Sequence, residues 1–340
     1  MSHTPIDAAR SRRRFMAGSI ALTTFPWAAF PLAVKAQQIT ANATLQTAPD
    51  HDTASLAAHT DAANHLTVQV GINDALYHFV VDTGAERSVI ADNVAAELAL
   101  PLGPMVMVDG ISRRIEAQTA KIADLRFGPF SRQNLTIPIL PRTSLVADGY
   151  LGLDAINGSR VTFDFRDHTV TIEQPKNAFI PDDPVAGSAH IKARGSAGHL
   201  RVVDCLVDSV AATAFIDTGA EVSVGNPALY EALKSRNKGL KETSAMVLTG
   251  VTGGEVTGQV VPVTRIRLQG LAFTNGTLVM ADVPDFDNWG LSERPALLIG
   301  MDYLRQFSRV SIDYRAKIIR FELSMAPPNP TPGVEIGTNA

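Results

Sequence analysis

Residues 79–89 read FVVDTGAERSV, and residues 214–224 read AFIDTGAEVSV. In both stretches an apolar run leads into an Asp-Thr-Gly triplet, which begins at Asp82 in the first and at Asp217 in the second. A short run of Val, Ile and Phe predicts a buried strand, so each aspartate is expected to end such a strand. Threonine can anchor a tight turn and glycine lets another backbone approach closely. The sequence therefore predicts two similar turns, each carrying a carboxylate at the end of a strand.

Further blocks of sequence repeat in the same order, roughly 135 to 150 residues apart. The matching pairs are 105–111 with 246–251, 150–154 with 298–302, and 161–166 with 310–315. Together with the Asp-Thr-Gly stretches they indicate an internal duplication.

The composition predicts a β-rich chain, because Val, Thr, Ile and Gly are frequent and aromatic residues make up only 6%. Alternating and apolar patterns predict strands over 66–70 and 76–81, whereas 91–100 and 227–233 are expected to be short helices. A length of 340 residues predicts two domains.

The two copies set the expected domain boundaries. They are lobe 1 at 65–175 and lobe 2 at 191–325, separated by a Pro- and Asp-rich linker at 176–190 and flanked by a flexible lead-in at 37–64 and a Pro-rich tail at 326–340. A linker of about fifteen residues is long enough for the lobes to pair within one chain, so we expect a monomer.

The N-terminus carries the features of an export signal. Residues 11–16 read SRRRFM and precede a moderately apolar stretch, which resembles the twin-arginine signal of bacteria. The resemblance implies a signal peptide at 1–36 and a periplasmic or secreted protein. The alternative is an uncleaved anchor, although Pro26 and Pro31 interrupt a segment that is barely long enough to span a bilayer. No other apolar run approaches the roughly 18 residues of a spanning helix, so we expect no stable membrane insertion after cleavage.

Several function classes are disfavoured by composition and by missing motifs. A net charge of −4 gives no electrostatic reason to expect nucleic acid as a partner. The single cysteine, Cys205, excludes an internal disulfide and a zinc site built on paired thiolates. The eight histidines form no His-Glu-x-x-His pattern. We therefore expect neither a metal nor an organic cofactor.

Two facing carboxylates would have a specific chemistry. If a pseudo-two-fold axis relates the lobes, Asp82 and Asp217 meet on it. Two carboxyls about 3 Å apart cannot both ionise, so they share one proton. The ionised member can take a proton from a water while the protonated member polarises a carbonyl, which amounts to general acid–base attack on an amide.

These motifs together resemble the retropepsin-like aspartic protease family, in which Asp-Thr-Gly-Ala is followed by a glycine-tipped flap and then by two apolar residues and Gly. The resemblance covers about 65–175 and 190–325, as two such halves fused in tandem in bacterial exported aspartyl proteases. It implies a mainly β, bilobal acid-protease fold with two β-barrel lobes, and an aspartic endopeptidase acting on a peptide or protein substrate. The alternative is a catalytically silent peptide-binding module on the same fold.

The resemblance also implies roles for individual residues. Asp82 and Asp217 would be catalytic. The residues that would support this dyad are Thr83, Thr218, Gly84, Gly219, Ala85 and Ala220. The flap residues that would bind substrate are Gly110, Ile111, Gly250 and Val251. Ordinary hairpin turns are the alternative interpretation of these last four.

The sequence departs from related families at two places. Ala85 and Ala220 stand where pepsin-like enzymes carry a hydroxyl that lowers a catalytic pKa, so a less acidic optimum is expected. Glu86 and Glu221 occupy the place of a retropepsin aspartate that pairs with a distant Arg. That Arg is missing from the position after the apolar-apolar-Gly block, so both glutamates are expected to be surface carboxylates.

Overall fold

The computed structural model describes residues 45–47, 53–60, 65–174, 187–195, 199–323 and 333–336. The predicted signal at 1–36 lies outside the described residues. Residues 41–340 belong to one compact unit. Within the described ranges, no helix has the length and apolar character needed to cross a membrane.

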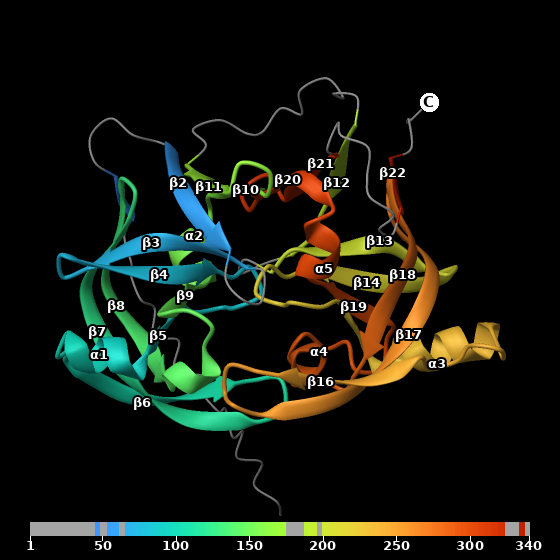
Figure 1. Cartoon of the computed structure of the whole chain (residues 1–340), viewed down its shortest axis with the longest axis horizontal. Coiled ribbons are helices and arrows are strands. Elements are labelled where there is room, and N and C mark those ends of the chain that lie inside the picture. Colours follow the sequence, from blue (N-terminus) through green and yellow to red (C-terminus); the bar gives the residue numbers. More distant parts are fainter. Residues whose placement is uncertain are drawn as a thin grey trace, which may run out of the picture. The chain divides into compact units, whose positions relative to one another are not determined.

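Lobe 1 follows the predicted succession of strands and short helices (Figure 1). Its elements are β3 (Leu66–Ile72), β4 (Ala75–Val81), β5 (Val89–Ala91), α1 (Asp92–Glu97), β6 (Leu102–Asp109), β7 (Arg114–Phe127), β8 (Phe130–Leu140), the 3-10 helix η1 (Arg142–Ser144), β9 (Gly149–Leu151), α2 (Leu153–Ile156), β10 (Arg160–Asp164) and β11 (Thr169–Glu173).

Lobe 2 repeats this order. Its elements are β12 (Ser188–Lys192), β13 (Arg201–Val207), β14 (Val210–Ile216), β15 (Val224–Gly225), α3 (Pro227–Arg236), β16 (Ser244–Thr249), β17 (Glu255–Leu268), β18 (Leu271–Met280), α4 (Pro284–Asn288), β19 (Ala296–Ile299), α5 (Met301–Leu304), β20 (Phe307–Asp313) and β21 (Ile318–Leu323). Strands β1 (Leu45–Thr47), β2 (Thr53–Thr60) and β22 (Gly333–Ile336) complete the described chain.

Each lobe contains a barrel-like ring of 6 strands, in the orders β3-β4-β9-β5-β8-β7 and β13-β14-β19-β15-β18-β17. In each ring the strand that leads to Asp-Thr-Gly pairs in parallel with the strand of the apolar-apolar-Gly block, β4 with β9 and β14 with β19. Phe79, Val80 and Val81 are all buried, as expected for a strand covered on both faces. The predicted mainly β fold with two barrel lobes is confirmed.

A separate group of strands joins the lobes. Strands β12, β21, β20, β10, β11 and β2 pair in that order, so the sheet takes strands from both copies. At its centre β10 pairs antiparallel with β20, with Val161 opposite Ile312 and Phe163 opposite Val310. The duplicated blocks 161–166 and 310–315 therefore meet around the axis that relates the copies.

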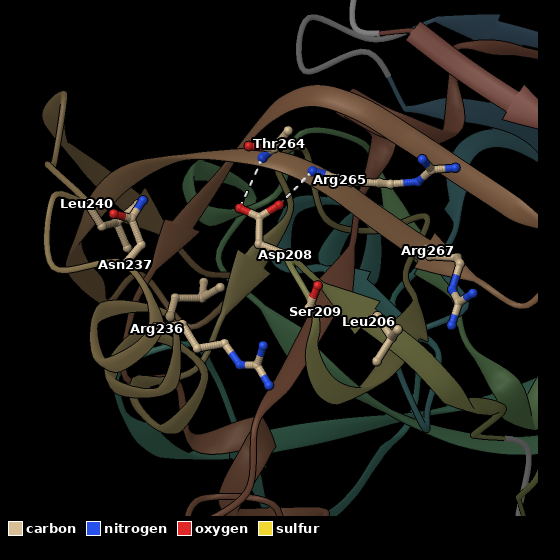
Figure 2. Close-up of a pocket in the computed structure, with 10 residues that line it drawn as sticks. Leu206, Asp208, Ser209, Arg236, Asn237, Leu240, Thr264, Arg265 and Arg267 are labelled. Atoms are coloured by element: carbon tan, nitrogen blue, oxygen red, sulfur yellow. Dashed lines mark hydrogen bonds between the residues drawn. The ribbon is translucent and has the colours of Figure 1, made fainter.

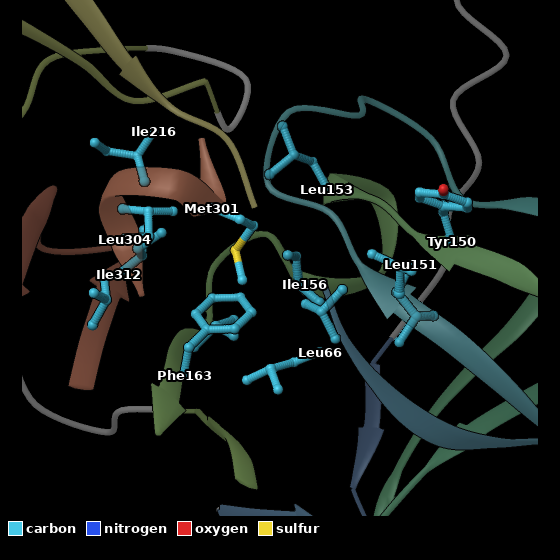
Figure 3. Close-up of a cluster of buried hydrophobic side chains, with 14 of the residues drawn as sticks. Leu66, Tyr150, Leu151, Leu153, Ile156, Phe163, Ile216, Met301, Leu304 and Ile312 are labelled. Atoms are coloured by element: carbon cyan, nitrogen blue, oxygen red, sulfur yellow. The ribbon is translucent and has the colours of Figure 1, made fainter. Parts of the chain in front are cut away.

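Buried side chains of both lobes pack together beside this interlobe sheet. Figure 3 shows Met301 of lobe 2 pointing toward Phe163 and Ile156 of lobe 1. All three are at most 1% exposed. This shared core fixes the two Asp-Thr-Gly turns relative to each other.

The expected lead-in, linker and tail are not purely connecting segments. The lead-in 37–64 contains β1 and β2, which pair with β8 and with β11 and β3. Strand β12 begins inside the expected linker 176–190, and β22 of the tail 326–340 pairs with β18. Strand β2 was missed because it is rich in Ala and Thr and shows no clear apolar alternation. Only Ala54 and Ala58 of this strand are buried.

Candidate active site

The two aspartates occupy matching positions in their lobes, directly after β4 and β14. The Asp82 N–H donates to the Leu151 carbonyl at 2.9 Å, and the Asp217 N–H donates to the Ile299 carbonyl at 3.0 Å. Each acceptor is the last residue of β9 or β19. The parallel strand pairs therefore hold both aspartates at the ends of β4 and β14, as the sequence predicted.

The threonines interlock across the lobe boundary. The Thr83 hydroxyl donates to the Ile216 carbonyl at 3.0 Å, and the Thr218 hydroxyl donates to the Val81 carbonyl at 2.7 Å. Each hydroxyl also accepts from the other threonine's backbone N–H, at 3.1 and 3.0 Å. Both side chains are buried. Four hydrogen bonds thus join the turns into a single rigid unit.

The glycines give the carboxylates room to meet. A Cβ atom at Gly84 would overlap the Asp217 carboxylate, and a Cβ atom at Gly219 would overlap the Asp82 carboxylate. Each aspartate therefore lies against the glycine of the opposite lobe. No residue larger than glycine fits at either position without displacing a carboxylate.

Backbone N–H groups stabilise the two carboxylates unequally. Asp82 Oδ1 accepts from Gly84 N at 2.8 Å and from Ala85 N at 3.0 Å. Asp217 Oδ1 accepts from Gly219 N at 2.9 Å, and among the described residues no second backbone N–H donates to it. Hydrogen bonds to a carboxylate favour its ionised form, so the turn favours ionisation of Asp82 over Asp217.

The pKa values of the pair follow this inequality. Burial and, after it, the charge of Asp82 together raise the pKa of Asp217 to about 7. Burial also raises the pKa of Asp82, against which the N–H groups of Gly84 and Ala85 act. The interaction of the two carboxyls with each other lowers the pKa of Asp82 and raises that of Asp217, so the shared proton is expected on Asp217.

Two further buried polar side chains interact electrostatically with this pair. His65, which is 4% exposed, lowers the pKa of both aspartates through its charge. Burial raises the pKa of Tyr314, and the charges of both aspartates add to that rise, so its hydroxyl stays protonated. Sequence reasoning missed both residues, although Tyr314 replaces Phe165 in an otherwise similar block.

The glycine-tipped turns of the two long hairpins contact each other. We call residues 110–113, between β6 and β7, the first tip, and residues 250–254, between β16 and β17, the second tip. A Cβ atom at Gly110 would overlap the Thr252 side chain, and one at Gly250 would overlap Ile111. Figure 1 places the ends of β4 and β14 between these tips and the interlobe sheet. Gly110, Ile111, Gly250 and Val251 are thus brought together by the fold.

The comparison with protein families agrees with this duplicated arrangement. The family model described as aspartyl protease matches residues 68–155 and 203–303, which together make up more than half of the chain. The chain belongs to the aspartyl protease family. The two matched regions fall in the two lobes and identify it as a tandem retropepsin-like member. A search of curated proteins returned no match.

In this family member, one of the two glutamates that follow Asp-Thr-Gly-Ala has a partner across the lobes. Glu86 Oε1 lies 3.2 Å from His199 Nε2, and this contact lowers the pKa of Glu86. Glu86 is 77% exposed, so it is a surface carboxylate as expected, but it is a paired one. The partner of Glu86 is thus His199 of lobe 2, and not an arginine that follows the apolar-apolar-Gly block.

Two aromatic side chains of lobe 2, Trp289 and Phe215, lie beside the His199–Glu86 pair. Trp289 stacks on Phe215 with ring centroids 4.1 Å apart, and its ring lies 5.8 Å from that of His199. Burial raises the pKa of nearby Asp285 to about 6, and the charges of Asp217 and Asp109 act in the same direction. This side of the site is aromatic and acidic.

Two surface hollows of the described chain lie elsewhere. The larger, of about 660 Å³, is on the outer face of lobe 2 (Figure 2) and is lined by Leu206, Asp208, Ser209, Leu233, Arg236, Asn237, Leu240, Thr264, Arg265 and Arg267. Asp208 there accepts backbone hydrogen bonds from Thr264 and Arg265, so its carboxylate holds a turn. The other hollow lies over the charged face of the interlobe sheet. Neither contains the aspartate pair.

Other reactive groups are few in the part of the chain that the structure describes. No group of three His, Cys, Asp or Glu side chains there has the arrangement of a metal site. Cys205 is buried, and burial raises the pKa of its thiol to about 12, so it is a poor nucleophile.

Proposed function

We propose that the protein is an aspartic endopeptidase in which Asp82 and Asp217 activate one water between them. The observation that carries this proposal is that two buried carboxylates, one from each lobe, each lie against the glycine of the opposite turn, with burial raising the pKa of both. A protein does not bury two carboxylates together without cost, and such pairs are a feature of sites that transfer protons.

The unequal hydrogen bonding assigns a role to each carboxyl. Asp82, with two backbone donors, is the ionised member and accepts a proton from the water. Asp217, with its raised pKa, holds the shared proton and donates it to the carbonyl oxygen as the water oxygen attacks the carbonyl carbon. The resulting tetrahedral intermediate breaks its C–N bond as the proton on Asp82 passes to the leaving nitrogen, while one hydroxyl of the intermediate returns its proton to Asp217 and re-forms the carbonyl. The carboxyl pair then returns to its singly protonated state.

The two hairpins serve as flaps over an extended peptide. Their tips meet on the side of the turns opposite the interlobe sheet, where a closed cover would exclude water from the carboxylates. An extended substrate would add its main chain to these edges by strand-like hydrogen bonds. The segment 11–16 leads us to propose export by a twin-arginine-type pathway, and hence a periplasmic or secreted site of action.

The test is cleavage of a peptide library by the full chain from about pH 3 to 8, which brackets the pKa values of such a pair. Asp82→Asn and Asp217→Asn are the variants. A shared dyad predicts that both lose all cleavage and that a statine-type inhibitor blocks the unmodified protein. Retention of cleavage in either variant would refute a joint site. Peptide binding without cleavage at any pH would establish the silent binding module instead.

A further inference from the structure

The two hairpin tips are joined by one side chain. Arg113 of the first tip donates from Nε at 3.1 Å and from Nη2 at 2.7 Å to the Thr252 carbonyl of the second tip. In return, the Thr252 hydroxyl donates to the Arg113 carbonyl at 3.3 Å. A guanidinium that gives two N–H groups to one carbonyl fixes both distance and orientation. These three bonds cross from lobe 1 to lobe 2.

The second tip is shaped to receive this side chain. Thr252 is only 2% exposed although it lies in a turn. Gly253 has a φ of +70°, and a Cβ atom there would lie 3.2 Å from Arg113 Nη2. A Cβ atom at Gly254 would overlap the Ser112 hydroxyl. The glycines therefore let the backbone of the second tip close around the Arg113 side chain.

The first tip also reaches into the opposite lobe. Ile111 packs against a buried cluster whose core residues, including Phe215 and Leu248, all belong to lobe 2. The tip of lobe 1 is therefore held by an apolar contact and by a charged hydrogen-bonding group at the same time.

The arrangement is one-sided despite the duplicated sequence. The second tip, 250–254, carries no basic residue that could make the reciprocal bond. Arg114, the neighbour of Arg113, bonds Asp109 of its own hairpin and is 57% exposed. Of these two adjacent arginines, only Arg113 bonds across the lobes. Arg114 therefore provides a matched control.

We propose that Arg113 is a positioning residue that locks the two hairpins together over the aspartate pair, so that substrate enters and product leaves only when its bonds to Thr252 break. The proposal rests on the proposed function for its link to substrate, whereas the lock itself consists of bonds between the protein's own residues. Loss of the guanidinium separates the tips without changing the carboxylates. Substrate retention then falls while the chemical step is preserved.

The first experiment measures the distance between the hairpins in the full chain. Met107 and Val247 are exposed on β6 and β16, so Met107→Cys and Val247→Cys can carry spin labels. Cys205 is 2% exposed with a raised thiol pKa, which keeps it unlabelled. We expect one narrow distance distribution in the otherwise unmodified protein, a longer and broader one with Arg113→Met, and an unchanged one with Arg114→Met.

Arg113→Lys keeps the charge but offers no planar pair of donors, so we expect an intermediate distribution. This variant decides the question if Arg113→Met fails to give a cooperative thermal melt. An unaltered distribution in a folded Arg113 variant would overturn the lock. This measurement needs no catalysis, so its outcome is independent of whether the protein cleaves peptides.

The second experiment separates KM from kcat on any peptide that the protein cleaves. If the contact of Arg113 only retains substrate, Arg113→Met should raise KM about tenfold and change kcat less than twofold. Arg113→Lys should restore part of the change, and Arg114→Met should match the unmodified enzyme. An equal fall in kcat and kcat/KM, with KM unchanged, would refute a role in retaining substrate.

Discussion

The hydroxyl of Thr218 provides a direct test of how the two lobes are held together. It donates to the Val81 carbonyl at 2.7 Å and accepts from the Thr83 N–H at 3.1 Å, both across the lobe boundary. Thr218→Val keeps nearly the same shape but removes both interactions. The buried Thr83 N–H then loses its acceptor, the Thr218 hydroxyl.

The expected cost follows from these two losses. A buried donor left without a partner costs about 1–3 kcal/mol, and the lost O–H donor contributes about 1 kcal/mol more. We therefore expect Thr218→Val to lower the free energy of unfolding by about 2–4 kcal/mol. Thr218→Ser, which keeps the hydroxyl and loses only a methyl group, should cost clearly less than the valine variant.

Urea unfolding followed by circular dichroism measures this difference, provided that the slope with denaturant is unchanged. The double variant Thr83→Val/Thr218→Val should cost less than the two single variants added together, because the two hydroxyls also contact each other at 3.3 Å and either single variant already removes that contact. Equal stability of the valine and serine variants, or full additivity in the double variant, would refute the interlocked arrangement.

Three further predictions concern the carboxylates and their glycines. Gly84→Ala places a methyl group on the Asp217 carboxylate and should reduce cleavage at least a hundredfold, whereas Gly71→Ala, with its nearest neighbour at 3.6 Å, should leave cleavage unchanged in the same assay. Ala220→Ser supplies a hydroxyl that can bond the ionised form of Asp217, the member that must stay protonated, so the alkaline limb of the pH–rate profile should move to lower pH; a shift to higher pH would contradict this. Folding raises the Asp217 pKa from 3.8 to about 7, so its contribution to stability is present below pH 4 and is lost as the pH rises through 7. Asp217→Asn should therefore gain about 2–4 kcal/mol relative to the unmodified protein between pH 4 and pH 8 in urea titrations, and a pH-independent difference would refute the raised pKa.

The parts of the site that were predictable from sequence are those built from local patterns. An apolar run followed by Asp-Thr-Gly specifies a strand and a turn within a few residues, and its repetition predicts that two such turns pair. The structure indeed brings Asp82 and Asp217 together and cross-links Thr83 with Thr218. The short helices α1 and α3 also lie where the pattern predicted them.

The parts that were missed depend on partners that are distant in sequence. Strand β2 is polar and alanine-rich, and it forms a strand because its backbone pairs with β11 and β3. The contact of His199 with Glu86 spans 113 residues, and that of Arg113 with Thr252 spans 139. Neither residue carries a local signal of its partner, because a histidine or arginine is compatible with any exposed turn.

Because both lobes belong to one chain, matching positions in them can carry different residues or make different contacts, which two identical subunits cannot do. His65 and His199 each precede a leucine: Leu66, which begins the ring strand β3, and Leu200, which comes directly before the ring strand β13. Three residue pairs join β2 to β3, the last of them at Leu66. The adjacent His65 is buried and lowers the pKa of both aspartates. On the lobe-2 side a single bridge, Arg194 with Arg201, stands at the corresponding place, and His199 instead contacts Glu86. The same His-Leu pair thus supplies a buried histidine that lowers the pKa of both aspartates in one lobe and an interlobe contact in the other, so the two halves of the site are chemically unequal although their sequence motifs match.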